Sequence, residues 1–306
     1  MRSTETKDKG GFLFLATAAI AEQAAALTGR GQPLLDSDDL SGKYVSAVFL
    51  YVKSLICYQK PEIASACRQP SFFIMKFEGK VAIVTGSSNG IGQATAVLLA
   101  AEGASVTIHG RSADGLKKTE KLILDHGIPP SSILLVQGEI QNDATLSALV
   151  RETIEKFGKI DILVNNAGTG GEAGMNLQTV EGYEFLNDIN LKSVMKLIEL
   201  AEAHLEKTEG NIVNVSSIAG ILPHSRHPTY AVTKAALDHY MKCRTHDLAK
   251  KGIRINNLSP GYVETNIFGK SGMTEDISAK LDTSNVLCWN RRTCSENLAL
   301  NISSLK

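Results

Sequence analysis

The sequence predicts an α/β fold in which helices cover a single, doubly wound parallel sheet. Two observations lead to this prediction. Short apolar strands alternate with helical patterns from residue 80 to residue 257, and each connection between strands is long enough for a crossover helix. A glycine-rich turn also follows the first strand, at the sheet edge where such folds place their ligands.

Composition agrees with one soluble α/β domain that carries terminal extensions. The 306 residues include 32 basic and 32 acidic side chains, and 43% of the residues are hydrophobic. Because the charge is balanced and forms no basic stripe, we expect no nucleic-acid partner. The five cysteines show no C-x-x-C or histidine spacing. The absence of such spacing argues against a metal site or a disulfide framework and favours free thiols in the reducing cytoplasm.

The first strand, near 80–85, ends in a glycine cluster that opens a helix near 90–102. Glycines allow a tight turn and let backbone N–H groups approach a pyrophosphate, whose charge the helix N-terminus favours. A glycine triplet alone is also compatible with an ordinary turn, but the flanking strand and helix favour phosphate binding. The predicted contacts of this turn are Gly86, Ser88, Asn89, Gly90, Ile91 and Gly92.

The second strand, near 104–109, is followed by Gly110 and Arg111 rather than by an acidic residue. An acidic residue at this place binds the ribose hydroxyls of NAD, whereas an arginine can fork onto the 2′-phosphate of NADP. Arg111 therefore predicts NADP(H) as the cofactor. The alternative is that Arg111 is a solvated loop charge before the next helix.

The remaining elements continue the alternation. Further strands are predicted near 132–136, 160–164, 210–215 and 252–257, and further helices near 112–127, 143–157, 183–207 and 228–250. The fourth strand runs into Asn165-Asn166-Ala167-Gly168, whose small residues let the chain pass close beneath a cofactor. The fifth strand delivers Ser216 and Ser217 at its end, again where doubly wound sheets bind ligands.

The last predicted helix carries the strongest catalytic signal. Tyr230 and Lys234 are four residues apart, so their side chains share one helix face. A free phenol has a pKa of about 10, and a neighbouring cation can stabilise its phenolate enough to allow proton exchange near neutral pH. Ser217 would then hydrogen-bond a substrate oxygen. Taken alone, the pair is also compatible with an amphipathic tyrosine and a snorkelling lysine.

Together these motifs resemble the short-chain dehydrogenase/reductase family, and the residues around them are similar to those of nematode members. The resemblance covers about residues 78–270. It rests on T-G-x-x-x-G-x-G at 85–92, N-N-A-G at 165–168, Asn190, Ser217, Y-x-x-x-K at 230–234 and Pro260-Gly261. It implies a Rossmann-like fold and hydride transfer between NADP(H) and a small-molecule carbonyl or secondary alcohol. It also suggests a homo-oligomer.

The resemblance further implies the role of each site residue. Tyr230 is the proton donor or acceptor, and Lys234 lowers its pKa and holds the nicotinamide ribose. Ser217 orients the carbonyl, and Asn190 fixes a water in a proton relay or, alternatively, is a polar residue that bends its helix. The remaining cofactor contacts are Arg111, Glu139, Asn166, Ala167, Gly168, Pro260, Gly261, Val263 and Thr265. Glu139 stands where the family usually has aspartate, so the carboxylate is retained.

Both ends of the chain depart from the family pattern around the expected domain at 76–270. Residues 1–75 precede the usual start and include an apolar run at 12–21, which leaves open a signal, a membrane anchor, a poorly ordered or loosely docked extension, or a mispredicted start of translation. The run is shorter than the ~20 apolar residues that span a bilayer, so membrane attachment is not favoured. Residues 271–306 form an atypical tail without the usual seventh strand, which leaves six core strands.

The atypical tail keeps a second hypothesis open, a non-catalytic nucleotide-binding or interaction protein that retains the core. A disabled relative generally needs to lose only one member of the acid/base group. Here Asn190, Ser217, Tyr230 and Lys234 are all present. The sequence therefore favours an NADP-dependent oxidoreductase.

Overall fold

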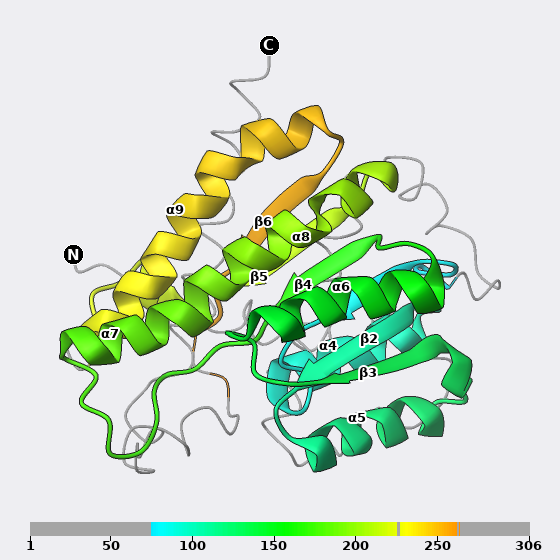
Figure 1. Ribbon diagram of the computed structural model, residues 1–306, viewed down its shortest axis with the longest axis horizontal. Coiled ribbons are helices and arrows are strands. Elements are labelled where there is room, and N and C mark those ends of the chain that lie inside the picture. The colour runs from blue at the N-terminus through cyan, green and yellow to red at the C-terminus, as the bar shows by residue number, and fades with distance from the viewer. Residues whose placement is uncertain (1–74, 225–226, 262, 264–306) are drawn as a thin grey trace, which may run out of the picture. The chain divides into compact units, whose positions relative to one another are not determined.

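The computed structural model describes residues 75–224, 227–261 and 263, which fold around one parallel sheet (Figure 1). Within these residues the sheet has six strands in the order β3-β2-β1-β4-β5-β6. The strands are β1 Val81–Val84, β2 Ser105–Gly110, β3 Ile133–Gln137, β4 Ile162–Asn165, β5 Asn211–Val215 and β6 Arg254–Leu258. The predicted doubly wound, Rossmann-like sheet is thus confirmed, and its order reverses between β1 and β4.

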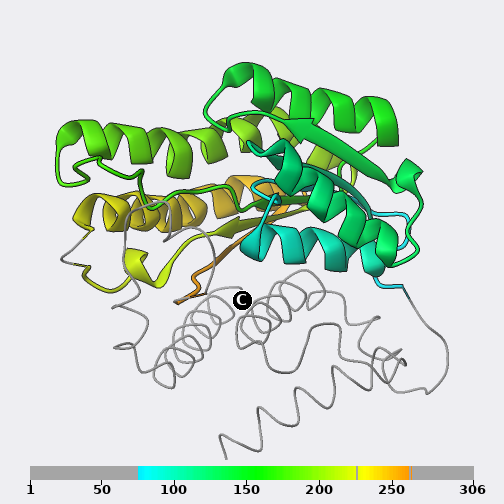
Figure 2. The ribbon, with the colours of Figure 1, turned by 90° about the horizontal axis from the view of Figure 1, so that it is seen from below.

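Helices cover both faces of the sheet, as the two ribbon views show (Figures 1 and 2). The α-helices are α4 Gly90–Ala101, α5 Ala113–Asp125, α6 Asp143–Phe157, α7 Val180–Asn187, α8 Ser193–Lys207 and α9 Pro228–Lys250. Helices α4 and α5 contribute to one apolar cluster, and α6, α8 and α9 contribute to a second cluster against the other face. Because both faces are covered, the central strands are continuous apolar runs, such as the fully buried Val81–Val84.

Three short helical turns complete the described elements, and one of them alters the prediction. They are η1 Pro130–Ser132, η2 Asp188–Lys192 and η3 Ile218–Gly220. The helix expected over 183–207 is instead α7 and α8 joined by η2, which has π-helical geometry. The wider turn carries Asn190, whose side chain bonds the backbone of Thr169, and such π-turns often mark functional sites.

Residues 1–74 of the extension predicted at 1–75, and the whole atypical tail predicted at 271–306, lie outside the described residues. The question of a seventh strand therefore lies there too. Among the helices of the described residues, none is both long and apolar enough to span a bilayer.

A buried carboxylate fixes the start of β4 to the start of β1. Asp161 is only 4% exposed and accepts hydrogen bonds from the Val81 N–H at 2.9 Å and the Lys80 ammonium at 2.7 Å. The Lys159 ammonium lies 3.0 Å from Asp161 Oδ2, the oxygen that also accepts the Val81 N–H. Burial raises the pKa of Asp161, but the hydrogen bonds from these partners outweigh it, so the pKa is below its usual range. The ionised form therefore stabilises the fold.

We predict that Asp161→Asn lowers the free energy of unfolding by about 1–3 kcal/mol at neutral pH, because it removes a buried charge from its donors. The native pKa of Asp161 is depressed, so this contribution is complete above the ordinary aspartate value of 3.8 and is lost as the pH falls through the lower native value. Urea unfolding at several pH values measures the difference. Asp125→Asn, in the exposed pair with Lys121, is the control and should change stability by less than about 0.5 kcal/mol.

Candidate functional site

The glycine-rich turn connects β1 to α4 at the point where the strand order reverses. Gly86 has φ of +65°, and a Cβ built on it would lie 2.8 Å from the Ala167 Cα atom. A Cβ on Gly92 would overlap the Asn166 side-chain nitrogen and the Gly86 carbonyl oxygen. Both positions therefore require glycine, because the segment that follows β4 packs directly against the turn.

Hydrogen bonds between Thr85 and Asn166 hold these two segments together. The Thr85 hydroxyl oxygen accepts the backbone N–H groups of Asn166 and Ala167, at 2.9 and 3.0 Å. The Asn166 side-chain amide donates in return to the carbonyl oxygens of Thr85 and Gly86, at 2.9 and 3.1 Å. The end of β4 is thus fixed to the end of β1.

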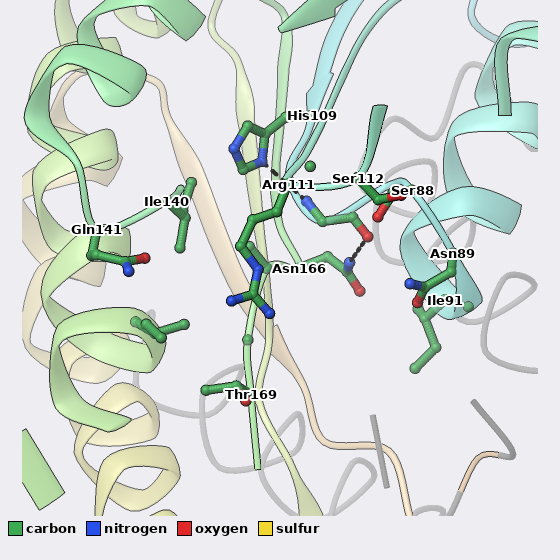
Figure 3. Close-up of a pocket in the computed structure, with 16 residues that line it drawn as sticks. Ser88, Asn89, Ile91, His109, Arg111, Ser112, Ile140, Gln141, Asn166 and Thr169 are labelled. Carbon is green, nitrogen blue, oxygen red and sulfur yellow. Dashed lines mark hydrogen bonds between the residues drawn. The ribbon is translucent and has the colours of Figure 1, made fainter. Parts of the chain in front are cut away.

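A cavity of about 500 Å³ opens beside this junction, and Figure 3 shows its lining. The predicted cofactor residues that line it are Gly86, Ser88, Asn89, Gly90, Ile91, Arg111, Asn166, Ala167 and Gly168. Lining residues that sequence reasoning did not select are His109, Gly110, Ser112, Ile140, Gln141, Thr169 and Ile189. Those at the ends of β2 and β3 follow from the rule that ligands meet the carboxyl ends of strands. Ile189 and Thr169 carry no such signal.

Several predicted cofactor contacts do not line this cavity, and two of them belong to the segments just described. Gly92 lies beneath Asn166, where it permits the close packing of the turn. Glu139 is exposed, and its carboxylate accepts a hydrogen bond from the Gln141 side chain at 3.2 Å. Its neighbours Ile140 and Gln141 face the cavity in its place.

The cavity wall offers hydrogen-bond donors that suit an anionic ligand. Helix α4 begins at the cavity-lining Gly90, and its N-cap residue Asn89 makes no side-chain capping bond, so the first-turn N–H groups lack that acceptor. His109 is 2% exposed, and its Nδ1 accepts the Gly86 N–H at 3.3 Å. Its Nε2 is buried and has no hydrogen-bond partner among the described residues.

His109 is a neutral imidazole at physiological pH. Burial lowers its pKa to about 4, against an opposing effect of the Gly138 backbone. Because Nδ1 accepts a hydrogen bond, the neutral ring carries its proton on Nε2, which is therefore a donor. A glycine cradle, a helix N-terminus and a buried donor without a partner fit the phosphate and adenosine portions of a dinucleotide.

Arg111 lies at the cavity and is held only weakly. Its guanidinium is 3.4 Å from the Glu172 carboxylate, and the two side chains are 45% and 52% exposed. Its guanidinium extends across the cavity in Figure 3. An exposed pair of this kind contributes little free energy, so the guanidinium can exchange partners.

The four predicted catalytic residues are absent from the cavity lining, but Lys234 and Asn190 lie close to the lining residue Gly168. Lys234 is 5% exposed, and its ammonium donates to the Val215 carbonyl oxygen at 2.9 Å. It also lies 5.9 Å from the centre of the Tyr230 ring. A Cβ on the cavity-lining Gly168 would be 3.5 Å from the Lys234 nitrogen and 3.2 Å from the Asn190 side-chain oxygen. Of the pair that the helix spacing predicts, Lys234 thus lies beside Gly168, and the Tyr230 ring lies near its ammonium.

The pKa of Tyr230 differs from the expectation. Burial raises it, and a hydrogen bond with the Ser217 side chain acts in the opposite direction. Burial lowers the pKa of Lys234 to about 8, while attraction to Asp238 raises it. The direction of the Tyr230 shift is therefore opposite to the lowered pKa that the sequence predicted.

Asn190 is fully buried and joins three segments. Its Oδ1 accepts the Thr169 N–H at 2.9 Å, and its Nδ2 donates to the Thr169 carbonyl at 3.0 Å and to the Thr233 hydroxyl at 3.3 Å. These bonds hold the segment after β4 against α9. The positioning of this segment is thereby explained, and the proton relay stays a prediction.

The segment after β6 contributes less to the cavity than expected. Pro260 is buried, and its carbonyl accepts the Ile218 N–H at 3.0 Å. Val263 is buried as well. Pro260, Gly261 and Val263 are absent from the cavity lining, and Thr265 lies outside the described residues.

A glycine turn at the reversal point of a parallel sheet is typical of α/β proteins that bind nucleotides. The chain belongs to the short-chain dehydrogenase family, because the family model described as short chain dehydrogenase matches residues 80–276.

Related proteins share the same domain. A Caenorhabditis elegans short-chain dehydrogenase/reductase of unknown function, solved with cofactor, is 40% identical with a TM-score of 0.64, and the match covers 67% of this chain and 78% of that one. The apo-form of a C. elegans glucose dehydrogenase is 46% identical with a TM-score of 0.57, over 61% and 75% of the two chains. Mouse L-fucose dehydrogenase is 34% identical over 193 residues, or 63% and 68% of the two chains.

We predict that Gly92→Ala destabilises the protein by about 1–3 kcal/mol, because the added methyl forces the Asn166 amide and the turn apart. Thermal or urea unfolding measures the change. Gly170→Ala is the control, since a Cβ there meets no atom within 4 Å and should change stability by less than about 0.5 kcal/mol. Equal effects of the two substitutions would contradict the close packing of the turn.

Proposed function

We propose that this protein is an NADP(H)-dependent oxidoreductase that interconverts a small-molecule carbonyl and a secondary alcohol, with Tyr230 as the proton donor or acceptor. The observation that carries the proposal is the meeting of Lys234 and Asn190 with the cavity-lining Gly168, at the end of a cavity whose wall is the glycine turn. This observation supports an acid/base role for Lys234 and its neighbour Tyr230 beside the site that suits a dinucleotide.

The residues present fit a nicotinamide dinucleotide. The glycine turn and the first N–H groups of α4 would hold its pyrophosphate. Arg111 would leave Glu172 and bind the 2′-phosphate. A guanidinium binds phosphate through two parallel hydrogen bonds, and this contact is stronger than its exposed ion pair with Glu172. Bound at this site, the nicotinamide supplies or accepts the hydride.

The chain's own side chains handle the proton. Ser217, which interacts with Tyr230, would orient the substrate oxygen. Because the pKa of Tyr230 is raised, its phenol is protonated at neutral pH and can donate to that oxygen during carbonyl reduction. In the reverse direction the Tyr230 oxygen accepts the alcohol proton. Lys234 supplies positive charge close to the ring while that oxygen is negative.

The expected setting is the cytoplasm. Cys243 is an exposed free thiol, which suits a reducing compartment.

We predict that Tyr230→Phe lowers kcat by at least about 100-fold, because it removes the proton that the reaction needs. NADPH oxidation with a panel of ketones, quinones and diketones measures turnover, and a fluorescence titration should show NADPH binding within about threefold of the wild type. Tyr240→Phe on the same helix is the control and should keep turnover. Comparable turnover of Tyr230→Phe would refute the mechanism. Tight NADPH binding by the wild type with no turnover on any substrate would favour a non-catalytic binding protein.

We predict that Arg111→Ala weakens NADPH binding by about 10- to 100-fold and leaves NADH binding unchanged, because only NADPH carries the phosphate that the guanidinium would contact. Parallel titrations with the two cofactors measure the preference. Arg151→Ala, which removes an exposed guanidinium from α6, is the matched control. An unchanged preference in Arg111→Ala would leave the NADP assignment without support.

A further inference from the structure

A row of three asparagines crosses the sheet on the face that α9 covers. Asn165, Asn214 and Asn257 are register partners on the adjacent strands β4, β5 and β6. The Asn165 amide donates to the Asn214 oxygen at 2.8 Å, and the Asn214 amide donates to the Asn257 oxygen at 2.9 Å. All the amides point the same way, so each hydrogen bond polarises the next.

The row ends at a carboxylate on α9. The Asn257 amide donates to Asp238 Oδ1 at 2.8 Å and to the Leu237 carbonyl at 3.2 Å. The other carboxylate oxygen of Asp238 is buried and has no hydrogen-bond partner among the described residues. A Cβ on Gly220 would lie 2.8 Å from this oxygen and 2.9 Å from the Lys234 carbonyl carbon. The turn η3 thus covers α9 between Asp238 and Lys234.

A buried carboxylate oxygen without a donor is unfavourable unless a positive charge lies near it. Lys234 is one helical turn before Asp238 and supplies such a charge. The attraction acts through space, because the Lys234 ammonium donates its hydrogen bond to the Val215 carbonyl. The asparagine row explains why the carboxylate stays at this place when it makes no direct bond to the lysine.

The other groups around the ammonium cannot balance its charge. Tyr230 on α9 is a phenol that burial keeps neutral. The side chain of Asn190 from η2 and the backbone of Gly168 are uncharged. Among the described residues, Asp238 is the carboxylate whose charge acts on Lys234.

We propose that Asp238 is a positioning residue, whose carboxylate is the counter-charge that keeps the buried Lys234 ammonium charged beside Tyr230, and that the asparagine row holds this carboxylate in place. The inference rests on the proposed function for the catalytic role of Lys234. The charge coupling itself is measurable without any substrate.

The test is an NMR pH titration of the full chain carrying lysine labelled with ¹³C at the ε carbon, with the Lys234 signal assigned from its loss in Lys234→Met. Asp238→Asn removes the charge but keeps an oxygen that can accept from Asn257. We expect the pKa of Lys234 to fall by about one unit, as for other close charge pairs. The matched control is Asp247→Asn, which removes an exposed carboxylate from the same helix, beside Lys250, and should leave that pKa unchanged. An equal pKa in wild type and Asp238→Asn overturns the proposal.

Two more variants separate charge from fold. Asp238→Glu keeps the charge and should return the pKa of Lys234 to near the wild-type value. Asn257→Ala breaks the row and keeps the charge, and should lower the pKa by a smaller amount than Asp238→Asn. No shift in Asn257→Ala would overturn the role of the row. If Asp238→Asn does not fold, Asp238→Glu and Asn257→Ala still decide the question.

The pH dependence of carbonyl reduction provides the link to catalysis. Removal of a negative charge favours deprotonation of both the ammonium and the phenol, so the alkaline limb of kcat should move to lower pH by about one unit in Asp238→Asn. A uniform fall in kcat with unmoved limbs would indicate a purely structural role and overturn the proposal. Absence of turnover in the wild type would instead refute the proposed function, while the lysine titration would still report on the charge pair.

Discussion

The structure of the site depends on the hydrogen bonds between Thr85 and Asn166. Strands β1 and β4 are paired neighbours up to Val84 and Val164, and beyond these residues the ladder ends. The Thr85 hydroxyl accepts two successive backbone N–H groups after β4, and the Asn166 amide returns two donors to the end of β1. The backbone N–H groups of the irregular segment after β4 thereby find hydrogen-bond partners without forming a helix or strand, and the cavity beside the segment has a fixed wall.

The second constraint is that buried polar groups surround the Gly168 end of the cavity. Buried amides are tolerated only when their donors and acceptors are paired. Asn190 meets this need by binding the Thr169 backbone, and the asparagine row meets it by pairing its members across three strands. Because each group is held by partners from another element, the loop, the sheet and α9 keep a defined geometry beside Gly168.

The sequence predicted the parts of this structure that depend on local chemistry. Glycine at 86 and 92, apolar strands and the spacing of Tyr230 and Lys234 each reflect backbone geometry within a few residues. Properties that arise from distant segments were not predictable in the same way. The π-turn at Asp188–Lys192 follows from the partner that Asn190 finds in the loop after β4. Which residues after β3 line the cavity, Ile140 and Gln141 rather than Glu139, depends on the path of the chain as it leaves that strand.

The same burial acts in opposite senses on the pKa values of Tyr230 and Lys234. It disfavours every charged form, so it raises the pKa of the Tyr230 phenol and lowers that of the Lys234 ammonium. Ser217 opposes the rise in the Tyr230 pKa, and Asp238 opposes the fall in the Lys234 pKa. The hydrogen bond with Ser217 favours the Tyr230 phenolate without adding charge, whereas Asp238 favours the Lys234 ammonium. The pair is therefore most stable with both protons present, which is the state from which a phenol donates a proton to a carbonyl oxygen.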